Sequence, residues 1–204
     1  MNEKIAFAGH CEFRISNAEM VNRIIYAIKE EIKNGNFFYT MGTYGNFDKL
    51  ALSCCRELRK EYKNLKIEVV ITSLNQIKPK FIFNNLWGEE KFVPYQDVST
   101  ILYDVEEVYF KNRITKSNQN MIDNCDTLIC YINTKKHGSG AKRTYNYAKR
   151  KGLKIINLFK KEDDPYYFMN KEEQKKYLDD FYKNLLEELN KNKKNEKKTK
   201  SRSK

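Results

Sequence analysis

A glycine turn between residues 40 and 48 carries the clearest chemical signal in the sequence. It follows an apolar run that ends at Tyr39 and precedes a helical pattern that starts near Asn46. The turn reads Thr40-Met41-Gly42-Thr43-Tyr44-Gly45-Asn46-Phe47-Asp48. Glycines let the backbone approach a ligand closely, and the free amides that begin a helix carry the positive end of its dipole. The turn therefore predicts a phosphate site, although Gly-x-x-Gly turns also serve as plain strand-to-helix connections.

Two other turns hold the same position relative to predicted strands. Gly9-His10 ends the apolar run Lys4 to Ala8, while Gly138 to Ala141 follows the run Thr127 to Ile132 and opens a helix. Parallel sheets bind ligands beyond the carboxyl ends of their strands. Convergence of these turns would aim two helix N-termini at one pocket, which favours a phosphate-bearing ligand. The residues predicted to bind it are Gly9, His10, Gly42, Thr43, Tyr44, Gly45, Asp48, Lys116, Asn118, Gly138, Ser139, Gly140 and Ala141.

Two titratable side chains at these turns are candidates for catalysis. Asp48 lies in the first turn of a predicted helix, where a carboxylate either contacts a ligand, for instance a ribose hydroxyl, or caps the helix. His10 is a candidate ligand contact or general base. Hydrolysis of an N-glycosidic bond needs a carboxylate, whereas the helix start after Ser139 offers the cations Lys142 and Arg143. We therefore expect binding rather than catalysis.

No metal site and no cofactor is predicted. The five cysteines form no Cys-x-x-Cys pair, and the two histidines, His10 and His137, have no zinc-ligand spacing. Buried free thiols in a reducing cytosol are the ordinary role of such cysteines.

The elements that hold these turns alternate between strands and helices. Predicted strands cover Lys4 to Ala8, Asn36 to Tyr39, Ile67 to Ile71, Thr127 to Ile132 and Lys154 to Phe159. Between them, apolar residues recur at helical spacing, as at Met20 and Ile24 after the capping pair Ser16 and Glu19. The alternation predicts a Rossmann-like α/β fold, a mostly parallel sheet with helices on both faces.

The remaining segments are assigned by their irregularity or charge. Residues 73–115 form an irregular insertion, with a helix predicted near Gln96 to Leu102 and a short strand within Val105 to Phe110. We interpret this insertion as a lid over the sheet edge, with a plain surface insertion as the alternative. Residues 1–165 form the predicted ligand-binding domain, and 190–204 a disordered Lys-rich tail. Between them, 166–189 form a C-terminal helix whose inward side chains are Tyr177, Phe181, Leu185 and Leu189.

The basic charge of the chain is concentrated near its C-terminal end. The formal net charge is +12, of which residues 190–204 carry +7. This charge makes single-stranded nucleic acid an alternative partner, but not the favoured one. No stretch reaches the length of a membrane span, so no membrane partner is expected and the protein is expected to be cytoplasmic. Homo-oligomerisation stays open.

Several short motifs occur in the order of a known family. They are Gly42, Gly45, Phe47, Asp48, Leu50 and Ala51; then Lys116, Asn118, Met121, Asp123 and Asp126; then Gly140, Ala141, Thr144, Tyr147, Ala148, Lys149, Lys151 and Gly152; and finally Ile155 to Leu158. From about Lys4 to Phe159 the sequence resembles the SLOG superfamily, and within it the YpsA-like branch of bacterial and phage proteins, which is related to the LOG phosphoribohydrolases. The resemblance implies a Rossmann-like domain that binds or senses a nucleotide or a nucleotide-derived ligand.

The sequence departs from this family where an enzyme would need its catalytic groups. Family members commonly have Lys-Arg-Asn where this chain has Lys116-Ser117-Asn118, and many have Gly-His-Arg where it has Gly9-His10-Cys11. The related hydrolases place a catalytic Glu beyond the second glycine turn, where this chain has Lys142-Arg143-Thr144. The resemblance therefore favours binding or sensing, with nucleotide cleavage of the nucleoside 5′-monophosphate phosphoribohydrolase type as the alternative.

Overall fold

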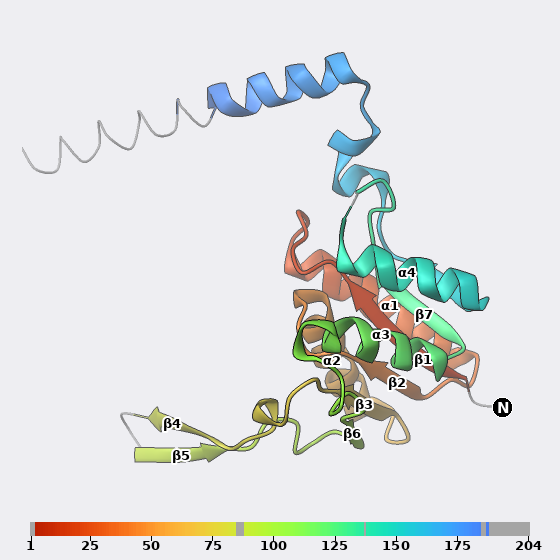
Figure 1. Cartoon of the computed structure of the whole chain (residues 1–204), viewed down its shortest axis with the longest axis vertical. Coiled ribbons are helices and arrows are strands. Elements are labelled where there is room, and N and C mark those ends of the chain that lie inside the picture. The colour runs from red at the N-terminus through yellow and green to blue at the C-terminus, as the bar shows by residue number, and fades with distance from the viewer. Residues whose placement is uncertain (1–2, 85–87, 137, 185–186, 188–204) are drawn as a thin grey trace, which may run out of the picture. The chain divides into compact units, whose positions relative to one another are not determined.

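A computed structural model of the chain describes residues 3–84, 88–136, 138–184 and 187. Its centre is a sheet of six strands, β1 (Lys4–Gly9), β2 (Phe38–Met41), β3 (Lys66–Val70), β6 (Thr100–Leu102), β7 (Thr127–Tyr131) and β8 (Lys154–Asn157). All neighbouring strands of this sheet pair in parallel. The predicted Rossmann-like α/β fold is therefore confirmed (Figure 1).

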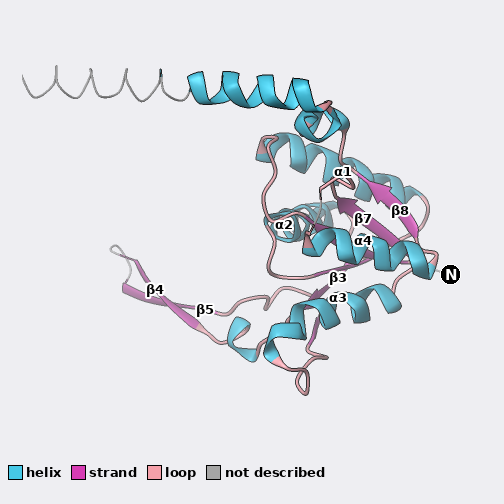
Figure 2. Cartoon of the chain, turned by 45° about the horizontal axis from the view of Figure 1, so that its top comes forward, coloured by secondary structure: helices cyan, strands magenta, loops and turns pink. Residues whose placement is uncertain are grey.

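Helices cover both faces of the sheet. On one face α1 (Asn17–Lys33) packs beside α2 (Asn46–Glu61), and on the other α3 (Arg113–Asp123) packs beside α4 (Gly140–Lys151) (Figures 1 and 2). The strand order is β6-β3-β2-β1-β7-β8, so the chain moves outward from β1 and then returns to pair β7 on the other side of it. The order thus reverses between β1 and β7, and open α/β sheets bind ligands at such a point.

The strand register aligns the carboxyl ends of the central strands. Gly9 of β1 lies opposite Tyr131 of β7, and Phe7 of β1 lies opposite Met41 of β2. The segments that start at His10, Gly42 and Ile132 therefore leave the sheet from one edge. This edge is where the sequence places its three glycine turns.

Local capping signals fix where the helices begin and end. The Ser16 hydroxyl accepts a hydrogen bond from the Glu19 N–H at 3.1 Å, and the Ser139 hydroxyl accepts one from the Lys142 N–H at 3.0 Å. Helix α4 ends at Gly152, whose φ of +79° favours glycine. Each helix also buries an apolar face against the sheet, and this packing stabilises the helices whose ends the caps define.

The structure differs from prediction within residues 73–115. The helix predicted near Gln96 to Leu102 is wrong, because Thr100–Leu102 forms the edge strand β6 beside β3. The described residues Val105 to Phe110 hold no strand, and a 3-10 turn, Phe110–Asn112, leads into α3. A three-residue strand has too little periodicity to be recognised in sequence, so its pairing with β3 decides its conformation.

The insertion also contains a hairpin of two antiparallel strands, β4 (Lys80–Asn84) and β5 (Gly88–Phe92). The hairpin is a separate two-stranded sheet, and it stands away from the main sheet in both ribbon views (Figures 1 and 2). The lid function of this insertion stays a prediction.

The chain divides into two compact units, residues 1–163 and 164–204. In the second unit, residues 171–184 are helical, and the Asn170 side chain caps their start by accepting from the N–H groups of Glu172 and Glu173 at 3.0 and 2.9 Å. Phe181, which we predicted to face inward, is 53% exposed. Leu185, Leu189 and the predicted disordered tail, 190–204, lie outside the described residues.

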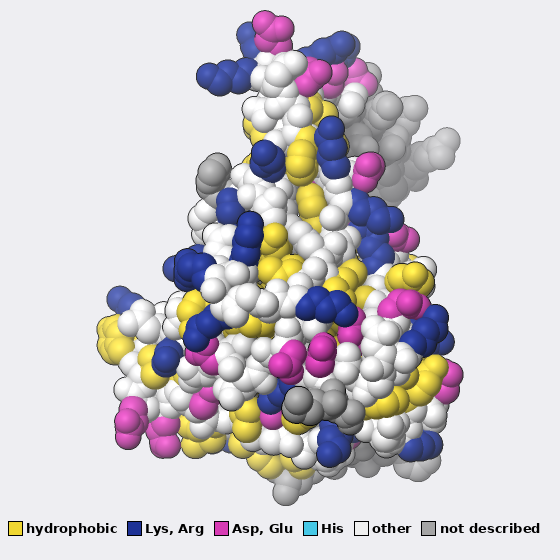
Figure 3. All heavy atoms as spheres, turned by 90° about the vertical axis from the view of Figure 1, so that its right-hand side faces the viewer, with side chains coloured by type: hydrophobic (Ala, Val, Ile, Leu, Met, Phe, Trp, Pro, Cys, Tyr) yellow, Lys and Arg dark blue, Asp and Glu magenta, His cyan; other side chains and the backbone are white. Residues whose placement is uncertain are grey.

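Surface charge and helix hydrophobicity bear on two of the expected partners, nucleic acid and the membrane. On the face drawn in Figure 3, Lys and Arg side chains are interspersed with acidic and apolar ones. Within the part of the chain that the structure describes, no helix is both long enough and apolar enough to cross a membrane.

Candidate functional site

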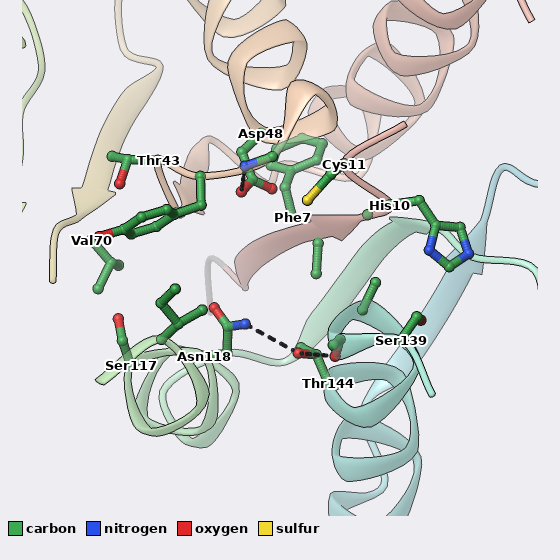
Figure 4. Close-up of a pocket in the computed structure, with 18 of the residues that line it drawn as sticks. Phe7, His10, Cys11, Thr43, Asp48, Val70, Ser117, Asn118, Ser139 and Thr144 are labelled. Carbon is green, nitrogen blue, oxygen red and sulfur yellow. Dashed lines mark hydrogen bonds between the residues drawn. The ribbon is translucent and has the colours of Figure 1, made fainter. Parts of the chain in front are cut away.

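A cleft of about 310 Å³ opens at the carboxyl ends of the central strands. Its walls come from the segments after β1, β2 and β3, from α3, and from the loop and first turn of α4 (Figure 4). Because the segments after β1 and β7 lead to opposite faces of the sheet, the cleft lies where the strand order reverses.

Most of the predicted site residues line this one cleft. They are Gly9, His10, Gly42, Thr43, Tyr44, Gly45, Asp48, Asn118, Ser139, Gly140 and Ala141. Lys116 and Gly138 are not among the lining residues, and both are exposed. On α3 the helical rotation turns Lys116 outward and brings Ser117, which is 3% exposed, to the cleft. The three glycine turns therefore converge, but without the lysine that we expected between them.

Close packing explains why glycine stands at position 9. A Cβ built on Gly9 would lie 2.4 Å from the Cγ of Phe47, which is far inside van der Waals contact. Phe47 itself is fully buried in the first turn of α2. The end of β1 and the start of α2 thus pack directly against each other, which holds two of the three turns together.

Asp48 caps the start of α2 from within the cleft wall. Its Oδ2 accepts a hydrogen bond from the Gly45 N–H at 3.1 Å, which is the side-chain half of a capping box. Burial raises the pKa of Asp48 to about 6, against the lowering effect of the backbone hydrogen bonds from Gly45 and Tyr44. The structure therefore assigns Asp48 the capping role, while leaving its carboxyl group at the cleft (Figure 4).

His10 is 8% exposed and is held by the loop after β7. Its Nε2 accepts a hydrogen bond from the Asn133 N–H at 3.0 Å. An imidazole that accepts at Nε2 is neutral and carries its proton on Nδ1. His10 therefore links the first turn to the start of the loop after β7, and its Nε2 is engaged by the protein rather than open to a substrate.

The polar side chains of the second turn are tied to the segment after β3. The Thr43 hydroxyl accepts from the Gln76 side-chain amide at 2.7 Å, and the Tyr44 hydroxyl lies 2.6 Å from the Thr72 hydroxyl. These bonds fix the turn on its side toward β3. Thr72 is a lining residue that we did not predict, although it follows the end of β3 as Gly42 follows the end of β2.

Helices α3 and α4 close the other side of the cleft. The Asn118 amide donates to the Thr144 hydroxyl at 3.3 Å, and that hydroxyl donates to the Gly140 carbonyl at 3.3 Å (Figure 4). Thr144 was also missed, yet it lies four residues after Gly140 and so on the same helix face. Other lining residues that we did not predict are Phe7, Ala8, Cys11, Glu12, Val70, Ile114 and Lys136.

Charged side chains give the cleft little attraction for an anion, which leaves that role to backbone amides and helix dipoles. Among the described lining residues, Lys136 is the one cation, whereas Glu12 and Asp48 are acidic. No group of three or more His, Cys, Asp and Glu side chains among the described residues could hold a metal ion. The arrangement suits an anionic group held by the N–H groups at the starts of α2 and α4.

No family model matches this chain, and no curated protein sequence matches it. Sequence similarity therefore adds no residue assignment to those that the geometry of the cleft supports.

Proposed function

We propose that this domain binds a nucleotide or a nucleotide-derived ligand in the cleft, with a phosphate group between the amino ends of α2 and α4. One observation carries the proposal: both helices begin at the same cleft, at the point where the strand order reverses. The contacting groups are the backbone N–H groups of Gly42 and Thr43 and those of Ser139 to Ala141, because Asp48 already accepts from the Tyr44 and Gly45 N–H groups.

The rest of the cleft fits the other parts of such a ligand. Its volume of about 310 Å³ is at the lower end of the range for small-molecule sites. Ile114, whose side chain is exposed, supplies apolar surface for a base, while Asn118 supplies a polar group for a sugar. The predominance of amides over catalytic side chains supports a role in sensing or sequestering the ligand.

Thermal-shift and calorimetric titration test this proposal. The panel comprises inorganic phosphate, nucleoside monophosphates, ADP-ribose and cyclic dinucleotides. At least one nucleotide should raise the melting temperature and bind with measurable heat, because a ligand that binds only the folded state stabilises it. A folded sample that responds to none of them would overturn the proposal.

The matched variants are Gly140→Val and Ala18→Val. A Cβ on Gly140 meets no atom within 4 Å, so valine fits the fold and covers the amides at the start of α4. Ala18 lies in the first turn of α1, which does not line the cleft. We expect Gly140→Val to abolish binding and Ala18→Val to retain it.

Hydrolysis of a nucleotide is a second candidate function, favoured by the pKa of Asp48. A cleft carboxyl group whose pKa is raised to about 6 by burial is suited to general acid or base catalysis. Release of free base from a nucleoside monophosphate, lost in Asp48→Asn, would establish this function. Binding without base release in the wild-type protein would exclude it.

A further inference from the structure

A second cavity, a groove of about 470 Å³, runs between α3 and α4 beside the cleft. One face of each helix forms it. Along α3 the lining residues include Ile114, Thr115, Asn118 and Gln119, and along α4 they include Arg143, Asn146, Tyr147 and Arg150. Both sets have the spacing of a single helix face. The groove is therefore formed where these two faces pack side by side.

The groove continues directly from the cleft. Ile114, Asn118, Gly140 and Thr144 line both cavities. The hydrogen bond from the Asn118 amide to the Thr144 hydroxyl spans the two helices at this junction. A long ligand can therefore extend from the cleft past Gly140 into the groove while it stays in contact with α3 and α4.

The two cavities differ in charge. The cleft has one lysine and two acids among its described lining residues, whereas the groove has the cations Lys111, Arg143 and Arg150 and no acid. Arginine in such a groove is well suited to a phosphate group, because its planar guanidinium donates two parallel hydrogen bonds. The cationic side chains thus gather beside the proposed nucleotide site rather than in it.

Arg150 contacts Tyr147, which also lines the groove. Its guanidinium carbon lies 5.7 Å from the centre of the Tyr147 ring, in a cation–π contact. The Tyr147 hydroxyl donates to Asp123 at 2.9 and 3.0 Å, and Asp123 also pairs with Lys151 at 2.6 Å. The aspartate is therefore occupied by its own partners, at the far end of α3 from the cleft.

We propose that the groove binds a second phosphate of the same ligand, which makes the preferred ligand a dinucleotide rather than a mononucleotide. The first nucleotide lies in the cleft, and its neighbour's phosphate lies between Arg143 and Arg150. This assignment rests on the proposed function of the cleft. Beyond that function, it specifies that the ligand has two nucleotides and that Arg143 and Arg150 select for the second one.

Calorimetric titration with AMP and with the 5′-phosphorylated dinucleotide pApA tests the assignment. We expect pApA to bind the full-length protein about tenfold more tightly than AMP, since a charge-assisted contact in the groove is added. Arg143→Gln and Arg150→Gln should each remove about that tenfold gain and leave AMP binding unchanged. Lys149→Gln removes the same charge from an exposed position of α4 outside both cavities, and should alter neither affinity.

The outcomes separate this assignment from the function of the cleft. If AMP binds but pApA binds no more tightly, or if both arginine variants bind pApA as the wild type does, the second site is wrong and the cleft proposal stands. If neither AMP nor pApA binds, both fail together. If a longer oligonucleotide binds far more tightly than pApA through the same arginines, the ligand is a nucleic acid and the dinucleotide assignment is overturned.

Discussion

The carboxylate of Asp48 accepts a hydrogen bond from the N–H of Gly45 at 3.1 Å, within the turn that forms one wall of the cleft. The contact is local, yet it brings a partly buried acid to the site at which we propose an anion binds. A negative Asp48 would repel that anion, whereas a protonated Asp48 would not. The ionisation of this one side chain therefore couples the stability of the fold to the chemistry of the cleft.

Replacement of Asp48 by asparagine should stabilise the protein at neutral pH. Burial raises the pKa from 3.8 to about 6 on folding, so the folded protein binds more protons than the unfolded chain between these values. The contribution of Asp48 to the free energy of unfolding therefore falls as pH rises through this window, by at most about 3 kcal/mol. Asp48→Asn removes this loss, and its amide oxygen can still accept from Gly45. Urea denaturation across pH 4 to 8 measures the difference.

The shape of that difference with pH is the control. The advantage of Asp48→Asn should be small below about pH 4, where Asp48 is protonated in both states, and should level off above about pH 7. A constant difference at all pH values would mean that the variant acts through packing or capping. A wild type that is more stable than the variant at pH 8 would contradict the raised pKa.

Gly9→Ala should destabilise the protein by about 2 kcal/mol, because overpacking forces neighbouring atoms to move. The added Cβ would lie 2.4 Å from the Phe47 ring, and Phe47 is fully buried. Gly140→Ala is the matched control, since nothing lies within 4 Å of a Cβ at that position. Chemical denaturation of both variants decides the point, and equal stabilities would contradict the close approach of β1 and α2.

Asp163→Asn should cost about 3 kcal/mol, since it removes the buried one of the two carboxylates that pair with Arg23 and leaves only the more exposed Glu19. Asp163 binds Arg23 through both oxygens, at 2.6 and 2.9 Å, and its side chain is 3% exposed. Burial acts to raise the pKa of Asp163, but the hydrogen bonds from Arg23 and the Lys160 N–H outweigh it and lower the pKa. The contribution of the pair is therefore present above the ordinary aspartate pKa, near 4, and is lost as pH falls through the lowered value.

The control for that variant is Asp97→Asn. Asp97 has the same two-oxygen geometry with Arg56, at 2.7 and 2.6 Å, but its side chain is 39% exposed. An exposed pair of this kind is worth about 1 kcal/mol or less. Urea denaturation of both variants at neutral pH should separate the buried pair from the exposed one, and equal losses would show that burial is not what makes the Arg23 pair important.

The parts of the fold that could be predicted from sequence are those with strong local signals. A few neighbouring residues are enough to predict the helix start at Ser16, the helix end at Gly152 and the buried strand β7. Strand β6 could not be predicted, because three residues are too few for a period and their conformation depends on pairing with β3, which lies far away in the sequence. The β4–β5 hairpin likewise depends on pairing between two strands rather than on helical periodicity.

The parts of the candidate site that could be predicted are the glycine turns that follow strands or begin helices. Gly42 and Gly140 come directly after strands or open helices, so topology alone brings them together. The charge of Lys116 suggested a contact with phosphate, but its position on α3 turns it away from the cleft. The neighbouring Ser117, which carries no charge and was not predicted, lines the cleft instead. The groove was not predicted at all, because Arg143 and Arg150 acquire a shared surface only when α4 packs beside α3.

The most direct test of the central claim is a nitrogen-15 NMR titration with millimolar AMP and with inorganic phosphate. Glycine amides provide the probes and the internal controls in one spectrum. The account predicts large chemical-shift changes for the amides of Gly42, Gly45 and Gly140, which line the cleft, and none for Gly35 and Gly152, which lie outside it. The absence of any change at the three cleft glycines, or equal changes at all five, would contradict phosphate binding between the starts of α2 and α4.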